Sequence, residues 1–189
     1  MNDPFLEADR VTTEADAIKM SLMAALQRNK TYCDGLAEWR RNQFRAEWAS
    51  LIRKESQRYM NSSSPVTDGE HCETIRRISE AVTGRFGTSL IGGRLRFGTS
   101  QKAFNLYLKY LWRLGKIATA PPHCPVDGIV LGEAGLLGSW TQCDDEREYM
   151  TWIKKLRTEA QPKCLADWEY EVWLRGALKQ RAAGSRRCC

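Results

Sequence analysis

Hydrophobic residues recur at three- and four-residue intervals along most of this chain, which is the pattern of amphipathic helices. The pattern predicts helices over residues 13–29, 35–59, 69–84, 144–157 and 165–180. The clearest helix follows a glycine-rich segment and runs from Ser100 to Gly115. A serine can cap the start of a helix and a glycine its end. We therefore expect an all-α fold, a compact multi-helix domain.

The segments between these helices are marked by glycine and proline. Glycines punctuate residues 84–98, where we expect tight turns and one short hairpin. Residues 120–125 read APPHCP and must be extended, because proline lacks the backbone donor and restricts the residue before it. A short helix is expected to begin at Pro125 or Val126 and to reach Leu131.

The polar segment Asn61-Ser-Ser-Ser-Pro65 suggests how the chain is organised. We expect residues 61–67 to be a linker between an N-terminal helical pair, 13–60, and a functional core, 69–182. Together these parts would make one domain over 1–183. Residues 184–189, which end in Cys188-Cys189, are expected to be a disordered tail.

The charge of the chain favours a polyanionic partner. Lys and Arg exceed Asp and Glu by 29 to 23, a net charge of +6. Double-stranded DNA is therefore the first partner to consider. There is no apolar run of about 18 residues and no basic, apolar leader. We expect no membrane association and a cytoplasmic location, in the nucleoid if DNA is bound, with the seven scattered cysteines as free thiols.

The helix from Ser100 to Gly115 has a polar stripe opposite its large apolar residues. At about 100° per residue the stripe covers an arc of about 80°. Its members are Lys102, Asn105, Lys109 and Arg113. Such a stripe faces either a cleft or, in an ordinary surface helix, bulk water. Further along, Pro125-Val126-Asp127 places a carboxylate at a helix start, where it is either a plain cap or part of a site.

These two elements together resemble the helix-hairpin-helix DNA glycosylases. In that family a glycine-rich turn leads into a helix with a catalytic lysine, and an aspartate follows in a Pro-Val-Asp element. Here Gly98-Thr99 precedes Lys102-Ala103, and Pro125-Val126-Asp127 follows. The match covers about 34 of the 189 residues. The Leu-Pro-Gly-Val-Gly hairpin of the family is absent, and the spacer from lysine to aspartate is longer than in its commonest members, as in archaeal relatives specialised for oxidised guanine.

The resemblance implies a base-excision enzyme, a glycosylase and lyase that works through a lysine Schiff base without a cofactor or metal. Lys102 would attack the deoxyribose carbon, and Asp127 would orient or deprotonate the amine. Lys109 is the second candidate nucleophile. The damaged base would be flipped out of the duplex, and oxidised guanine is the expected lesion. The candidate nucleic-acid contacts are Arg94, Arg96, Asn105, Lys109 and Arg113.

Two other readings compete with the enzyme. The only histidines stand in His-Cys pairs, so a zinc ion could take His71, Cys72, His123 and Cys124 as ligands. Adjacent ligands rarely bind one ion well, however, and no CxxC motif exists. The alternative function is a non-enzymatic helical module that binds nucleic acid or protein. An enzyme needs Lys102 and Asp127 in one cleft, whereas a binding module does not.

Overall fold

The regular structure of this protein is helical. The computed structural model describes residues 3–27, 29–61 and 64–185, and in these ranges the only β pairing is one isolated bridge between Tyr32 and Leu90. The elements are α1 (Pro4–Asp9), α2 (Glu14–Leu26), α3 (Glu38–Asn61), α4 (Asp68–Phe86), the 3₁₀ turns η1 (Gly87–Ser89) and η2 (Ile91–Gly93), α5 (Phe97–Arg113), α6 (Gly128–Glu133), α7 (Glu146–Ala160) and α8 (Leu165–Ser185). The predicted all-α class is confirmed.

Local sequence signals explain where several helices begin. The Thr13 hydroxyl accepts from the Asp16 backbone N–H, and the Asp16 carboxylate accepts from the Thr13 N–H, which makes a capping box at α2. Thr67 and Glu70 form the same arrangement at α4. Each box satisfies backbone donors that a helix start leaves unpaired.

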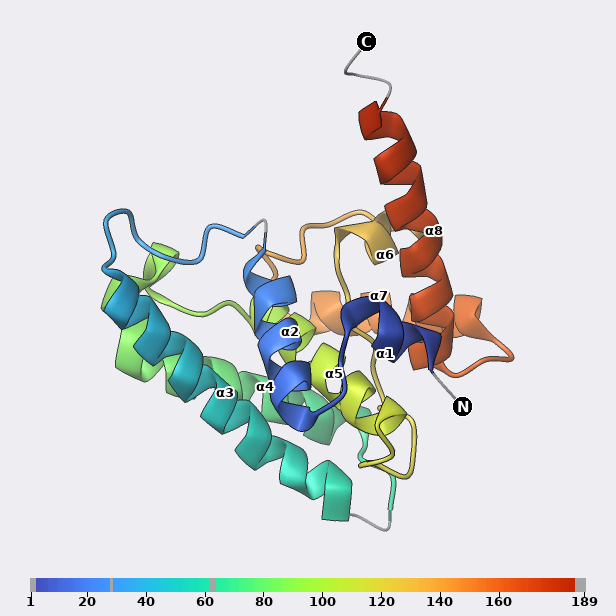
Figure 1. Ribbon diagram of the computed structural model, residues 1–189, viewed down its shortest axis with the longest axis horizontal. Coiled ribbons are helices and arrows are strands. Elements are labelled where there is room, and N and C mark those ends of the chain that lie inside the picture. The colour runs from blue at the N-terminus through green and yellow to red at the C-terminus, as the bar shows by residue number, and fades with distance from the viewer. Residues whose placement is uncertain (1–2, 28, 62–63, 186–189) are drawn as a thin grey trace.

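Helix α5 is central to the packing. It lies against α2 on one side and α4 on another, while α3 packs on α4 and α6 packs on α8 (Figure 1). Helix α3 forms one edge of the molecule, and α8 extends beyond the body at the other side (Figure 1). Every residue of α5 from Phe97 to Leu111 is buried. Lys102, Asn105 and Lys109 of the polar stripe therefore lie in the protein interior, while Arg113 reaches the surface, and α5 is not an ordinary surface helix.

The predicted helices are all present, with their ends shifted by a few residues, and two details differ. Ser100 does not cap α5, because the helix begins at Phe97 and the Ser100 hydroxyl instead donates to the Ile75 carbonyl. The expected hairpin is replaced in the described chain by η1 and η2, with Gly92 and Gly93 at φ +71° and +74°. Backbone in this left-handed region favours glycine.

The sequence pattern does not predict α1, a six-residue helix that is too short to show a period. The Asp3 side chain accepts from the backbone N–H groups of Phe5 and Leu6, and proline stands in the first turn. Part of the expected linker, residues 62–63, and the end of the expected tail, residues 186–189, lie outside the described residues, while 184–185 belong to α8. No helix within the described ranges has the length and apolarity needed to cross a bilayer.

Candidate active site

The Asp127 carboxylate lies between a helix start and a lysine. Its Oδ1 accepts hydrogen bonds from the backbone N–H groups of Ile129 (2.9 Å) and Val130 (3.0 Å), which caps α6. Its Oδ2 accepts a hydrogen bond from the Lys102 ammonium. One oxygen is thus used by the backbone and the other by the cation, so the carboxylate is fixed in orientation.

Lys102 belongs to the second turn of α5, and its side chain is only 8% exposed. Its Nζ lies 5.7 Å from the centroid of the Trp140 ring, which also limits access of water. Removing both ions of a pair from water is costly, so a buried pair is poor evidence for stability and is a reason to look for function. The two residues that the sequence singles out are brought together.

The loop that carries Asp127 is attached to α5 by two amide side chains. Gln101 donates to the Val126 carbonyl (2.6 Å) and accepts from the Val126 N–H (3.2 Å). Asn105 donates to the Cys124 carbonyl (2.9 Å). Because these contacts hold the backbone on both sides of Pro125, they fix where Asp127 meets Lys102.

A buried polar network continues from Asn105 into the core. The Asn105 Oδ1 lies 2.7 Å from His71 Nε2, and its amide nitrogen donates to the Tyr149 hydroxyl (2.9 Å). The Tyr149 hydroxyl lies 3.0 Å from His123 Nδ1, and His123 Nε2 lies 3.1 Å from Asp68. Burial lowers the pKa of both histidines, which are therefore neutral at pH 7.

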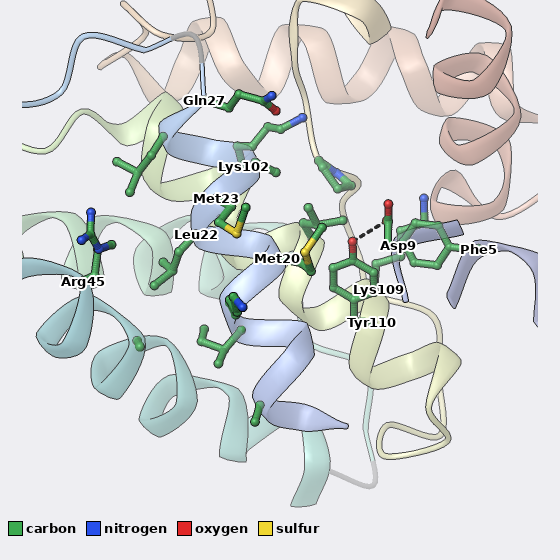
Figure 2. A pocket seen from close by; sticks show the side chains of 18 of the residues that line it. Phe5, Asp9, Met20, Leu22, Met23, Gln27, Arg45, Lys102, Lys109 and Tyr110 are labelled. Atoms are coloured by element: carbon green, nitrogen blue, oxygen red, sulfur yellow. Dashed lines mark hydrogen bonds between the residues drawn. The ribbon is translucent and has the colours of Figure 1, made fainter. Parts of the chain in front are cut away.

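A cavity of about 1050 Å³ is lined by residues of α1, α2, α3, α5 and α8. Lys102 and Lys109 both line it, at separate places along the wall (Figure 2). The α2 side of the wall is largely apolar, with Leu22 and both Met20 and Met23. Asp127 does not line the cavity and instead reaches Lys102 from the loop behind it. The residue with the candidate nucleophile therefore lines the cavity, and its acid partner does not.

A second buried ion pair lines the same cavity. The Lys109 ammonium donates to Glu169 of α8, and their side chains are 1% and 5% exposed. The Lys109 Nζ lies 4.3 Å from the centroid of the Phe5 ring and 5.3 Å from that of Tyr170. Burial raises the pKa of Glu169, and the neighbouring Lys109 opposes that rise.

The candidate nucleic-acid contacts fall into two groups. Asn105 and Lys109 are 0% and 1% exposed, so neither lies on the outer surface that the phosphates of a duplex could reach in this conformation. Three arginines remain near the surface and are paired with acids. Arg94 (3.1 Å) and Arg96 (2.6 Å) share Asp144, and Arg113 contacts Asp3 (3.3 Å) and Asp167.

The two His-Cys pairs do approach each other, but their side chains have other partners. The ring centroids of His71 and His123 are 4.4 Å apart, and the Cys72 Sγ lies 3.5 Å from Met150 Sδ. Burial raises the pKa of Cys72 to about 11 and that of Cys124 well above its ordinary value, which opposes the thiolate form that binds zinc. No group of three His, Cys, Asp or Glu side chains in the described chain could hold a metal ion, and the cysteines of that part are free.

Sequence reasoning missed three residues of this region: Gln101, Trp140 and Glu169. Glu169 had a signal, because it falls on the buried face of α8 between Leu165 and Val172 at helical spacing. A carboxylate at such a position is rarely buried without a partner. Gln101 and Trp140 carry no such signal.

Comparison with known proteins leaves the site to be judged on its own geometry: no family model, no curated protein and no solved structure matches this chain.

Proposed function

We propose that this protein is a base-excision enzyme, a DNA glycosylase with lyase activity that uses Lys102 as its nucleophile. One observation carries the proposal. Lys102 lines a large cavity, and its amine is paired with a carboxylate whose orientation is fixed by backbone donors. A nucleophilic amine next to a positioned base is the arrangement that covalent catalysis requires.

In the reaction, Asp127 takes a proton from the Lys102 ammonium, and the neutral amine attacks C1′ of the deoxyribose. The new C–N bond replaces the glycosidic bond, and the base leaves with its bonding electrons and acquires a proton. The sugar ring then opens to an imine, with the ring oxygen becoming a hydroxyl. Loss of a C2′ proton from this imine expels the 3′ phosphate, which is the lyase step.

The cavity suits a nucleotide that has left the duplex. Ligand sites typically enclose about 300–1,000 Å³ and are mostly apolar with a few placed polar groups. The cavity next to Lys102 has this size and this character. Base flipping is least costly for a damaged or mismatched base, so a damaged base is the expected substrate.

The test is to trap the imine. Borohydride adds hydride to the imine carbon and leaves a stable amine between protein and DNA. We expect an adduct with duplex DNA that carries oxidised guanine or an abasic site. Lys102→Gln should abolish it. Asp127→Asn, which can still cap α6 but cannot take a proton, should slow adduct formation by about a hundredfold.

Lys116→Gln is the matched control, because Lys116 is exposed after α5 and should leave trapping unchanged. Trapping that survives in Lys102→Gln but disappears in Lys109→Gln would transfer the nucleophile to Lys109. A folded protein that forms no adduct with abasic DNA or with any damaged base would overturn the proposal and leave the binding module.

A further inference from the structure

We propose that Lys109 and Glu169 form the end of the cavity that reads the base, and that they select nucleobases presenting a carbonyl oxygen next to a ring N–H. The inference rests on the proposed function, because it takes the sugar to react at Lys102. The inference starts from the observation that one cavity is lined by two buried lysines, whereas the proposed reaction needs only one nucleophilic lysine.

The spacing of the two lysines fits a nucleoside. Lys102 and Lys109 are seven residues apart on α5, which is about two helical turns. They therefore project to nearly the same side, about 10.5 Å apart along the axis. With C1′ in contact with the Lys102 amine, a base that points along α5 places its far edge near Lys109. No other ion pair of the described chain has both of its members among the residues lining this cavity.

Aromatic rings lie at the Lys109 end of the cavity, where the ring of the base would lie. The Phe5 and Tyr170 rings both line the cavity and both face the Lys109 ammonium. Their centroids are 5.1 Å apart with an edge-on geometry. Phe5 is buried and stacked on Tyr110, so the partly exposed Tyr170 ring is the surface on which we place the base. Aromatic faces stack on bases without regard to sequence, which leaves selection to the polar pair.

The hydrogen-bonding character of the pair sets the selection. An ammonium only donates, and an ionised carboxylate only accepts. Lys109 has three donors, and in the described chain Glu169 is its hydrogen-bonding partner. A carbonyl oxygen can therefore accept from Lys109 while a ring N–H donates to Glu169. This lactam edge is present in oxidised purines, hypoxanthine and uracil, and also in guanine and thymine. Adenine and cytosine offer an amino group and an unprotonated ring nitrogen, and the amino N–H is a less acidic donor to the carboxylate. The pair therefore excludes adenine and cytosine, while the lower cost of flipping favours damaged or mismatched bases among those that carry the edge.

Abasic-site DNA separates this inference from the function beneath it, because it presents the sugar without a base. We would measure borohydride adducts on abasic DNA, and base release from duplexes carrying uracil, hypoxanthine, oxidised guanine, or mismatched adenine or cytosine. The wild-type protein should release the lactam bases at least tenfold faster than adenine or cytosine. Glu169→Gln should reduce the rate of lactam-base release by a factor at least ten times larger than the factor by which it reduces the yield of borohydride adduct with abasic DNA.

Glu169→Gln leaves Lys109 buried beside a neutral partner and can impair folding. The double variant Lys109→Met/Glu169→Leu removes both charges at similar volume and keeps the test valid. It should still form the abasic adduct while losing release of the lactam bases. Lys116→Gln, on the surface, should change neither readout.

Three results would overturn the inference. In the first, base release and adduct formation fall equally in the double variant, although circular dichroism shows that it is folded. The pair would then only hold α5 against α8. In the second, the wild-type protein releases adenine or cytosine as fast as the lactam bases. In the third, it reacts with abasic DNA but releases no base. Failure to form an adduct even with abasic DNA would instead overturn the proposed function and, with it, this inference.

Discussion

The two histidines must remain neutral for the core to stay intact. His71 and His123 are fully buried with ring centroids 4.4 Å apart, and a charge on one ring disfavours a charge on the other. Burial lowers the pKa of each below its value in the unfolded chain. Between these values the unfolded state binds more protons than the folded state, so acidification favours unfolding.

The free energy of unfolding should therefore be nearly constant above pH 7 and should fall as the pH drops below about 6.5. With both histidines contributing, the slope should approach about 2.7 kcal/mol per pH unit. This slope is measured by urea unfolding, followed by tryptophan fluorescence, at several pH values between 5 and 8. Asp68 does not titrate in this pH range. Hydrogen bonds from His123 and Arg157 lower the pKa of its carboxyl group, so its negative charge is lost only at lower pH.

His71→Gln cannot take up a proton, and it should reduce this slope by about half even though the variant is less stable overall. A slope that is the same in the variant would show that His71 does not titrate in this range. The comparison depends on the slope alone, so the cost of the substitution itself does not affect it.

The sequence identifies single residues only where their chemistry and their spacing coincide. The contact between Lys102 and Asp127 could be predicted only through the resemblance of Gly98-Thr99 and Pro125-Val126-Asp127 to the motifs of a known family. Trp140 could not, since its ring reaches Lys102 from a loop with no periodic pattern. The sequence suggests Lys109 as a DNA contact because helical spacing cannot reveal its partner. That partner, Glu169, lies 60 residues later in another helix.

At the scale of elements, the start of α5 is determined by a close approach. A Cβ on Gly98 would lie 1.7 Å from the carbonyl oxygen of Trp140 and 3.2 Å from the Cys143 Cβ. The Gly98 N–H also donates to the Cys143 carbonyl at 2.8 Å. Sequence reasoning placed Gly98 in a turn before the helix. It lies in the first turn, where this contact brings the Trp140 loop against α5 and so against Lys102.

Gly98→Ala should therefore destabilise the protein by about 1–3 kcal/mol or more, because the added methyl group meets backbone that must move. Urea unfolding checks the value. The matched control is Gly84→Ala, also in a helix, where a Cβ meets nothing within 4 Å. That change should be neutral or stabilise by about 0.5–1 kcal/mol. Equal effects of the two substitutions would contradict the role of the contact.

The hydrophobic period predicts helices α2 to α5, α7 and α8 well, because each of them buries an apolar stripe against a neighbouring helix. The short helix α6 was expected from the proline-rich segment before it. The pattern fails at α1, which is shorter than two turns and owes its position to distant partners. It also fails to show that the polar face of α5 is buried. Periodicity reports that one face differs from the other, and the polar residues found on α4, α7 and α8 decide whether that face meets water.

For the whole molecule, the net charge of +6 overstates the positive surface available to DNA. The three arginines that remain as candidate contacts are all paired with aspartates. Binding to phosphates must replace these pairs, so the contacts are few and electrostatic. We expect duplex affinity to fall about tenfold or more between about 50 and 200 mM salt.

Arg94→Gln should reduce the slope of log affinity against log salt by about one, as measured by fluorescence anisotropy with a labelled duplex. Arg58→Gln, at the far end of α3, should leave the slope unchanged. An equal effect of both variants would show that the contacts are not at the site proposed. Absence of binding at about 50 mM salt would exclude DNA as the partner.

Helix α1 is tied to parts of the chain that are synthesised much later. Asp9 accepts from the Tyr110 hydroxyl 101 residues further on, and Phe5 packs against both Tyr110 and Tyr170. At about 5–20 residues per second, roughly 8–30 seconds separate the synthesis of Asp9 and Tyr170. A six-residue helix has no stability of its own, so during this time the nascent segment is open to proteases and chaperones. The cavity can therefore acquire its final wall only after α8 has been synthesised, long after α1.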